Sequence, residues 1–297
     1  MKALILAQKK TQYETKRIIE EFTKLNIRSD VVKPSSIDVI VSREDKTSIR
    51  IRGSVVSLPD VVIPRTGSGT GYFSLAVLRQ FERLKVPLCN SSLGIENVKD
   101  KFYAHQLMVS KGLPIPKTIL AKKNISVALV QKQIGFPCVV KIVTGSYGEG
   151  VYLSRDRKSF KDLIELIDSL NSKSSVLIQE FVAEKFGTDI RVLVIGNECI
   201  GAIERKSTDG SFKANLTRGG VAKTIDITKD IQNLSLKAAR DMNLDIAGVD
   251  LLYDKKGLKI CEVNSAPGFE GFERSTNINV AEKICRLALL KVKPIAI

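Results

Sequence analysis

The stretch AGVDLLYDKKGLKICEVNSAPG, residues 247–268, carries the strongest fold signal in the chain. It consists of two runs of apolar residues separated by Lys255-Lys256-Gly257, a pattern typical of a β-hairpin. A three-residue turn would place Gly257 in the left-handed conformation, which glycine adopts without strain. The cross-strand pairs predicted from this turn are Asp254–Leu258, Leu252–Ile260 and Asp250–Glu262.

Three oxygen-bearing side chains meet on one face of this predicted hairpin. Glu262 and Asn264 lie two apart on one strand, so they share a face with each other and with Asp250 opposite. Carboxylates placed opposite each other repel unless a cation lies between them. Few protein oxygen ligands suit Mg²⁺ (or Mn²⁺) held together with substrate phosphates. The alternative is a solvated hairpin edge with ordinary acids, but the apolar neighbours of these residues favour burial.

A signal for phosphate lies upstream of the hairpin. Lys141 ends the apolar strand FPCVVK, and the glycine-rich stretch TGSYGEG follows closely. A lysine emerging from a buried strand is costly unless it meets an anion, and Gly145 and Gly148 would let backbone N–H groups approach phosphate oxygens. The stretch lacks the GK[ST] of a Walker motif, and alone it fits a plain hairpin turn equally well. Together with Lys141 and the downstream acids, it predicts a phosphate loop.

Composition excludes several kinds of chemistry. The chain has 297 residues, of which 43% are hydrophobic and 27% charged, as in ordinary soluble proteins with two or three domains. Five cysteines without a CxxC pair predict reduced, mostly buried thiols. The only histidine, His105, argues against a Ser-His-Asp triad. The apolar stretch 3–7 is too short for a signal-peptide core, and no run reaches the length of a membrane span, so we expect a cytoplasmic protein without membrane contact.

The formal net charge of +15 favours an acidic partner such as a nucleotide, a nucleic acid or an acidic peptide. The alternative is a basic protein whose charge serves only solubility. The charge is spread along the chain, without a basic tail or basic residues interleaved with aromatic ones. Direct nucleic-acid recognition is therefore not expected.

The order of the predicted elements divides the chain. Strands alternate with helices over residues 1–97, which predicts an open, mostly parallel α/β layer. The glycines of RTGSGTG, at Gly67, Gly69 and Gly71, have GxGxG spacing and lack the acidic residue of a dinucleotide motif, so a substrate loop beside Arg65 is preferred. Arg65 itself is either a ligand for a substrate carboxylate or a surface cap. From Ile95 onward, a long helix ending at Gly112 and antiparallel hairpins predict α+β units.

The motifs of the chain, in order, are KDK, VVK, the glycine loop, IQEFV, DIRVLVIG, IERK, ANLTRGG, GVD and EVNSAPG. This set resembles the ATP-grasp superfamily and, within it, the RimK-type ribosomal-protein glutamate ligases. The resemblance also includes VIPRTG and LRQFE and so covers nearly the whole chain. It implies an α/β and α+β fold, namely an ATP-grasp fold with an N-terminal Rossmann-like pre-ATP-grasp domain. The implied segments are a pre-ATP-grasp domain at 1–97, a central lobe at 98–182 and a C-terminal lobe with the metal site at 183–297.

The same resemblance implies roles for individual residues. Lys101 and Lys141 would hold the α- and β-phosphates. The remaining implied ATP contacts are Glu180 and Phe181 at the adenine, Asp189 at the ribose, and Lys213, Ala214 and Asn215 along the triphosphate. The implied metal ligands for two Mg²⁺ are Asp250, Glu262 and Asn264, and the implied catalytic residues facing the phosphoryl group and the substrate carboxylate are Arg205 and Arg218. Both arginines could instead be solvated surface charges. Lys213 stands where the family often has arginine, and lysine lacks the bidentate fork.

The implied activity is ATP-dependent ligation of glutamate, through an acylphosphate, to the C-terminal carboxylate of a ribosomal protein, or formation of poly-glutamate. Such chemistry depends on positioning and on charge neutralisation rather than on a histidine base. Two alternatives stay open: a ligase that adds an amino acid to a small carboxylate or cofactor, and a module that binds ATP without turnover. Members of this branch are often dimers or tetramers, so a homo-oligomer is possible.

Overall fold

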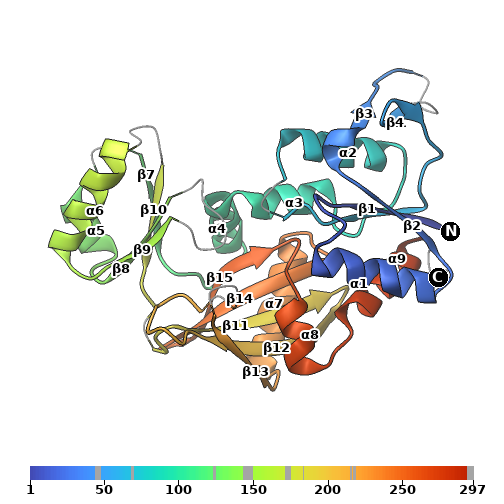
Figure 1. Cartoon of the computed structure of the whole chain (residues 1–297). Helices are drawn as coiled ribbons and strands as arrows, with labels where there is room; N and C mark the ends of the chain where they lie inside the picture. Colours follow the sequence, from blue (N-terminus) through green and yellow to red (C-terminus); the bar gives the residue numbers. More distant parts are fainter. Residues whose placement is uncertain are drawn as a thin grey trace.

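The structure is a computed structural model of the chain and describes most of it (Figure 1). The described residues are 1–43, 48–67, 70–122, 125–142, 150–170, 175–182, 184–214, 216 and 219–292. Within them, the strands form four sheets. Each of the predicted segments 1–97, 98–182 and 183–297 contains one of the three larger sheets, and the fourth is a small sheet near the N-terminus.

The first sheet is parallel, as the alternation of strands and helices predicts. Its strands, in spatial order, are β2 (Arg28–Val32), β1 (Lys2–Leu6) and β6 (Val61–Pro64). Alternate residues of β1 enter different cores: Ala3 and Ile5 pack with α1 (Tyr13–Lys24), whereas Leu4 and Leu6 pack with α2 (Tyr72–Arg83). Burial on both faces explains the uninterrupted apolar run of this strand.

A small antiparallel sheet lies beside this layer. It is formed by β3 (Ile37–Val39), β4 (Ile49–Ile51) and β5 (Ser54–Val55), and the short helix η1 (Pro34–Ser36) leads into it. The β4–β5 pair is the hairpin expected from the sequence.

The single helix predicted to end at Gly112 is two helices in the structure, α3 (Ser92–Lys99) and α4 (Lys101–Ser110). Asp100 interrupts them because its backbone is extended, with φ −87° and ψ 110°. Its carboxylate accepts hydrogen bonds from the backbone N–H groups of Phe102 and Tyr103, at 2.9 and 3.0 Å. The aspartate therefore acts as an N-cap that starts a second helix at Lys101.

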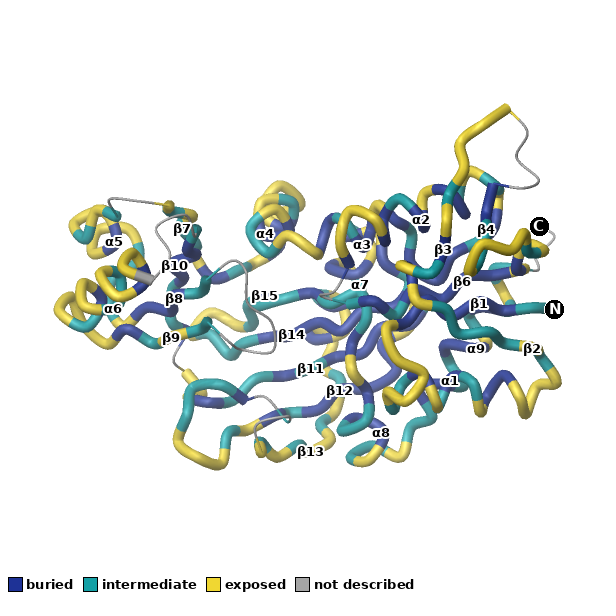
Figure 2. Tube along the Cα trace, turned by 45° about the horizontal axis from the view of Figure 1, so that its top comes forward, coloured by how far each residue is buried: buried dark blue, intermediate teal, exposed yellow. Residues whose placement is uncertain are grey.

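The second sheet has four antiparallel strands. Its strands, in spatial order, are β7 (Thr118–Ala121), β10 (Val176–Glu180), β8 (Cys138–Ile142) and β9 (Val151–Ser154). The helices α5 (Val127–Gln133) and α6 (Arg157–Leu170) cover one face and share a core with the sheet around Phe160 (Figures 1 and 2). The opposite face contains Lys141 of β8 and Gln179 of β10, so the polar residues of these strands project together away from that core.

The third large sheet forms the centre of the molecule. Its strands, in spatial order, are β13 (Val221–Ile225), β12 (Glu198–Lys206), β11 (Thr188–Ile195), β14 (Ile246–Asp254) and β15 (Gly257–Asn264). Neighbouring strands are antiparallel throughout, and β11 and β12 join through Gly196-Asn197 as the sequence predicts. Helix α7 (Lys229–Asp241) covers one face, and the three inner strands β12, β11 and β14 each contain a long buried run (Figure 2).

The β14–β15 hairpin confirms one predicted pair and corrects the turn. Asp254 pairs with Gly257, so the loop has two residues, Lys255 and Lys256, rather than three. Gly257 has φ +125° within this pair instead of occupying a left-handed loop position. The predicted partners Asp254–Leu258 and Leu252–Ile260 are therefore wrong, and the observed pairs are Tyr253–Leu258, Leu252–Lys259 and Leu251–Ile260. A bulge follows, after which Asp250 lies opposite Glu262, as predicted.

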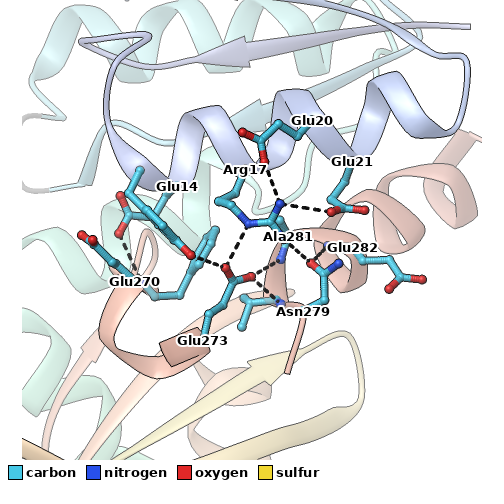
Figure 3. Close-up of polar contacts among 12 residues, drawn as sticks. Glu14, Arg17, Glu20, Glu21, Glu270, Glu273, Asn279, Ala281 and Glu282 are labelled. Carbon is cyan, nitrogen blue, oxygen red and sulfur yellow. Dashed lines mark hydrogen bonds and ion pairs between the residues drawn. The ribbon is translucent and has the colours of Figure 1, made fainter. Parts of the chain in front are cut away.

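The N-terminal part is fastened to the end of the chain through Glu273 (Figure 3). This residue lies in α8 (Glu270–Thr276), and its carboxylate accepts hydrogen bonds from the Tyr13 hydroxyl at 2.8 Å and the Arg17 Nε at 3.1 Å, both in α1. It also accepts the backbone N–H groups of Val280 and Ala281 at the start of α9 (Val280–Val292). One buried carboxylate thus joins three helices.

Two further findings concern the chain as a whole. All five cysteines are free and only Cys261 is less than fully buried, as predicted. Among the described residues, no helix combines the length and the apolar character needed to cross a bilayer.

We predict that Glu273→Ala destabilises the fold by about 3 kcal/mol, because the Arg17 guanidinium, the Tyr13 hydroxyl and two backbone N–H groups all lose their acceptor. Urea unfolding followed by circular dichroism measures the change. The matched control is Glu270→Ala in the same helix, whose ion pair with Arg274 is exposed, so its effect should stay below about 0.5 kcal/mol. Equal effects of the two substitutions would contradict the role of Glu273.

Candidate functional site

One face of the central sheet changes along its length from apolar to charged. On β11 and β14, the residues Ile190, Val192, Val249 and Leu251 pack into the core that contains α7. The intervening residues of the same strands project from the opposite face, which is apolar at one end of the strands and charged at the other. Leu193, Ile195 and Ile246 join the core shared with the N-terminal sheet, whereas Asp189, Arg191 and Asp250 form a polar cluster. The alternation of the strands therefore places these charges together on one face of the sheet, opposite the face that packs against α7.

Asp250 lies at the centre of this polar cluster. Arg191, opposite it on β11, donates from Nε and Nη2 to both carboxylate oxygens, at 2.7 and 2.6 Å. Arg205 on β12 binds Asp189 in the same bidentate way, at 2.7 Å twice, and its Nη2 also lies 3.1 Å from Asp250 Oδ2. Burial alone would raise the pKa of Asp250, but the Arg191 and Arg205 guanidinium groups outweigh it and hold that pKa below its ordinary value.

Glu262 and Asn264 extend the cluster onto β15, opposite Asp250 and Gly248. Glu262 is about one-third exposed, and its carboxylate lies 3.8 Å from the Lys101 ammonium, which the Asp100 cap holds at the start of α4. Lys101 and Glu262 are therefore neighbours across two segments that the sequence separates widely. The predicted residues Lys101, Asp250, Glu262, Asn264, Asp189 and Arg205 all lie on or beside this face.

The donor set suits a hard cation that brings its own ligands. Among the described residues, no three His, Cys, Asp or Glu side chains are close enough to bind a metal by themselves. Two carboxylates and one amide, with one oxygen each, leave half of the positions of an octahedral ion to water and phosphate oxygens, and proteins usually hold Mg²⁺ with nucleotides through few protein ligands. The residues therefore fit a magnesium ion that arrives with a phosphate ligand, and they do not form a complete metal cage.

The predicted phosphate ligand Lys141 lies on the four-stranded sheet β7–β10–β8–β9, not on the central sheet. The Lys141 ammonium donates a 2.7 Å hydrogen bond to Gln179 Oε1 of the neighbouring strand β10. The predicted phosphate-loop residues Gly145 and Gly148 lie outside the described residues, as do Asn215 and Arg218. The structure therefore shows where the Lys141 side chain lies, and the predicted phosphate loop after it lies outside the described residues.

The segment between the two antiparallel sheets contains the predicted adenine contacts. Glu180 ends β10, and its carboxylate accepts the Lys259 ammonium of β15 at 2.8 and 2.9 Å and the backbone N–H of Lys117 at 3.0 Å. Phe181 packs edge-on against Phe186 and Phe212, with ring centroids 5.8 and 6.3 Å apart. The Glu180–Lys259 ion pair thus joins the four-stranded sheet β7–β10–β8–β9 to β15, the edge strand of the central sheet.

Lys213 and Ala214 lie close to this aromatic group. The Lys213 ammonium lies 5.6 Å from the Phe212 ring centroid and 5.9 Å from that of Tyr152 in β9, and Ala214 is buried. Tyr152 belongs to the four-stranded sheet, whereas Lys213 follows β12 of the central sheet, so Lys213 reaches across the space between the two sheets.

The turn SAPG after Asn264 is held by the N-terminal part of the chain. Asn90 donates to the Ser265 carbonyl at 2.7 Å, Arg65 donates to the Pro267 carbonyl at 2.8 Å, and Glu14 accepts the Phe269 N–H at 3.1 Å. The Arg65 guanidinium also lies 5.6 Å from the centroid of the Phe269 ring. Arg65 therefore has a structural contact in addition to any contact with substrate. Gly67 lies next to Ala266, so the glycine loop borders the same turn.

Three residues that contact the site have no role in the sequence-based prediction: Arg191, Gln179 and Lys259. Arg191 could have been found, because it lies two residues after Asp189 and must share its strand face. Gln179 could also have been found, because a polar residue inside the otherwise apolar strand VLIQE indicates a polar partner on that face of the sheet. Lys259 carries no such signal, since its partner Glu180 is distant in the sequence and the contact depends on the fold.

His105 lies near both parts of the site. It is buried in α4, with Nδ1 3.3 Å from the Thr118 hydroxyl and Nε2 3.3 Å from the Cys261 carbonyl oxygen. Burial lowers the pKa of His105 to about 4, and the nearby charges of Lys141 and Lys101 add to the shift. The imidazole is therefore neutral near pH 7.

Comparisons with known proteins cover nearly the whole chain. Residues 1–95 match the family model described as the RimK PreATP-grasp domain, and residues 98–288 match the one described as the RimK-like ATP-grasp domain. The chain is 38% identical to a "Probable alpha-L-glutamate ligase" of Enterobacter sp. (strain 638), covering 96% of this chain and 94% of that protein. It is 38% identical to a "Ribosomal protein bS6--L-glutamate ligase" of Escherichia fergusonii, covering 96% and 95%.

Solved structures confirm the predicted fold class. The ATP-grasp ligase PsnB, in complex with a phosphomimetic variant of its minimal precursor, Mg and ADP, superposes with a TM-score of 0.77 at 20% identity, covering 98% of both chains. A D-alanine--D-alanine ligase from Bacillus anthracis gives a TM-score of 0.70 at 14% identity, covering 98% of this chain and 96% of that one. At these identities the likeness concerns the fold alone.

We predict that the neutral state of His105 makes stability fall with acidification. The unfolded chain binds a proton near pH 6.5, whereas the folded chain resists it until about pH 4. The unfolded state therefore binds more protons in this window, and the stability that is present at pH 7 falls by about 3 kcal/mol as the pH drops from 7 to 4. Urea titrations at successive pH values measure this loss. The variant His105→Gln keeps every other titrating group, so it should lack this part of the slope, and parallel pH profiles for both proteins would refute the assignment.

Proposed function

Because the chain belongs to the RimK-like ATP-grasp family, we propose that it uses ATP to join the amino group of L-glutamate to the C-terminal carboxylate of an acidic peptide, such as the tail of a ribosomal protein. The prediction of an ATP-dependent glutamate ligase is confirmed by relatives that are named glutamate ligases and match nearly the full length of the chain. The acceptor, the metal ions and the roles of single residues are what we propose.

The observation that carries the proposal is the Asp250–Glu262 pair on the polar face of the central sheet. Lys101 lies beside this pair, and Lys141 projects from the polar face of the other antiparallel sheet. Acids on one sheet and a lysine on the other are the arrangement expected of a site that clamps a magnesium–nucleotide complex between two sheets.

The proposed chemistry balances in two steps. A carboxylate oxygen of the acceptor attacks the γ-phosphorus of ATP, the bond to the β-phosphate oxygen breaks, and ADP leaves. The amino group of glutamate then attacks the acyl carbon of the acylphosphate, phosphate leaves, and the nitrogen gives up a proton as the amide forms. Neither step needs a histidine base, which agrees with the buried and neutral state of the only histidine.

The residues of this chain would divide the work of binding. Lys101 and Lys141 bind the α- and β-phosphates, Arg205 and Arg218 face the transferred phosphoryl group, and Asp189 binds the ribose. Glu180 and Phe181 border the adenine, while Lys213, Ala214 and Asn215 line the triphosphate. Asp250, Glu262 and Asn264 would hold two Mg²⁺ (or Mn²⁺), which neutralise phosphate charge when bound.

An acidic acceptor is supported by the charge of the chain. The formal net charge is +15, and a cationic surface raises the local concentration of an anionic tail or product. Arg65 and Gly67 border the turn after the metal strand, so the acceptor would approach between this turn and the N-terminal part.

We predict glutamate-dependent release of ADP and phosphate from Mg²⁺-ATP in the presence of a peptide that ends in free glutamate. Asp250→Asn should lower this rate at least about 100-fold, because it removes one of the two paired carboxylates that face the cation. A coupled ADP assay with each amino acid in turn measures the donor preference. The matched control is Asp230→Asn, an exposed aspartate in the first turn of α7, which should keep the wild-type rate.

The same peptide with an amidated C-terminus tests the attachment point. Release with the free acid but not with the amide would establish ligation to the C-terminal carboxylate. Equal release with both would assign attachment to side chains. Release with glutamate alone would favour poly-glutamate formation, and no glutamate-dependent release with any acceptor would overturn the proposal.

A further inference from the structure

His105 connects the two halves of the site through an unbroken series of hydrogen bonds. Lys141 donates to Gln179 at 2.7 Å, and Gln179 Nε2 donates to the Thr118 hydroxyl oxygen at 3.0 Å. That oxygen lies 3.3 Å from His105 Nδ1, and His105 Nε2 lies 3.3 Å from the carbonyl oxygen of Cys261. The series begins at a predicted phosphate ligand and ends one residue before Glu262.

The protons along this series can be assigned from the acceptors. A backbone carbonyl only accepts, so Nε2 of His105 must bear the hydrogen that it donates to Cys261. In the neutral ring Nδ1 is then an acceptor, and Thr118 supplies the donor. The Thr118 hydroxyl has one proton and also lies 2.9 Å from the Pro116 carbonyl, so the two acceptors share it. The neutral Nε2–H tautomer satisfies both ring nitrogens.

The contact at Cys261 falls on the irregular part of β15. Cys261 is the extra residue between the pairs Leu251–Ile260 and Asp250–Glu262 and has no partner of its own on β14. β15 is also the edge strand of its sheet. An edge strand has unpaired backbone groups, and α4 and the chain that follows it provide partners for them: His105 of α4 donates to the carbonyl of Cys261, and Pro114 after α4 accepts the N–H of Ile260 at 2.8 Å.

Helix α4 lies alongside β15 in both views of the molecule (Figures 1 and 2). We propose that His105 is a positioning residue that fixes the bulge beneath Glu262 and, through Thr118 and Gln179, the ammonium of Lys141. This inference rests on the proposed function, because it assumes that Lys141 binds phosphate and that Glu262 faces the metal. Its effect is to hold the two binding groups, which belong to different sheets, at one fixed separation.

ATP binding tests the two sides of His105 separately without requiring turnover. We call the contacts from His105 through Thr118 and Gln179 to Lys141 the lysine arm, and the contact from His105 to Cys261 beside Glu262 the strand arm. Calorimetry in EDTA measures ATP affinity without metal and so reports the lysine arm, and the gain in ATP affinity on adding Mg²⁺ reports the strand arm. Thr118→Val removes the hydroxyl that joins Gln179 to His105 and should weaken ATP binding in EDTA about fivefold while leaving the Mg²⁺ gain unchanged. Thr118→Ser keeps the hydroxyl and should restore the wild-type affinity.

His105→Leu removes both arms and should weaken ATP binding in EDTA as well as reduce the Mg²⁺ gain, each about fivefold. His105→Gln retains a donor that can reach the Cys261 carbonyl, so it should preserve most of the Mg²⁺ gain. The matched control in the same helix is Gln106→Leu, at an exposed position, which should bind as the wild type does.

A purely structural histidine would give a different result. His105→Leu and Thr118→Val would lower the melting temperature but leave both affinities unchanged, or Thr118→Ser would lose as much as Thr118→Val, and either outcome would overturn the inference. Because ATP binding needs neither glutamate nor acceptor, failure of the ligase assay with normal ATP binding would count against the proposed function alone.

Discussion

The bulge at Cys261 is the constraint on which the rest of the site depends. The two-residue turn sets Asp254 opposite Gly257, and without interruption the same register would place Cys261 opposite Asp250. Glu262 would then lie opposite Val249 and point into the apolar core beneath α7, because a slip of one residue moves every side chain to the other face. Burying an unpaired carboxylate there would be costly. The extra residue returns Glu262 and Asn264 to the face of Asp250.

The sequence predicted the pairing of Asp250 with Glu262 but assumed the wrong turn. A three-residue loop and a two-residue loop followed by a bulge give the same pair, so the apolar pattern near the acids cannot distinguish them. The bulge depends on contacts from His105 and Pro114, which precede β15 by more than a hundred residues and become neighbours only in the folded chain. For the same reason the ion pair of Lys259 with Glu180 was not predicted.

The sequence pattern predicted the strands and helices whose own residues carry a clear apolar period and failed at the others. The strands with continuous or alternating apolar residues were found, including β1, β8, β11 and β14. The strand β13, with the sequence VAKTI and mostly exposed side chains, was not. The helix break at Asp100 was missed because the apolar period continues across it, although an aspartate followed by a helix is a known capping pattern. At Asp100 the conformation is decided by the residue's own side chain, so the sequence alone already contains the information that a helix begins after it.

The charges on the polar face of the central sheet contribute to stability whatever their part in binding. Arg205 is only 3% exposed and contacts both Asp189 and Asp250, so removing it would leave two buried carboxylates with reduced compensation. A loss of activity in an Arg205 variant alone would therefore not identify a catalytic residue, because Asp250, the proposed metal ligand, would be disturbed at the same time. Arg191 is bound to Asp250 in the same bidentate way and shares this ambiguity. Asp250→Asn shares it too, because it removes the charge toward which both arginines point, so its effect on binding is interpreted only beside its effect on unfolding.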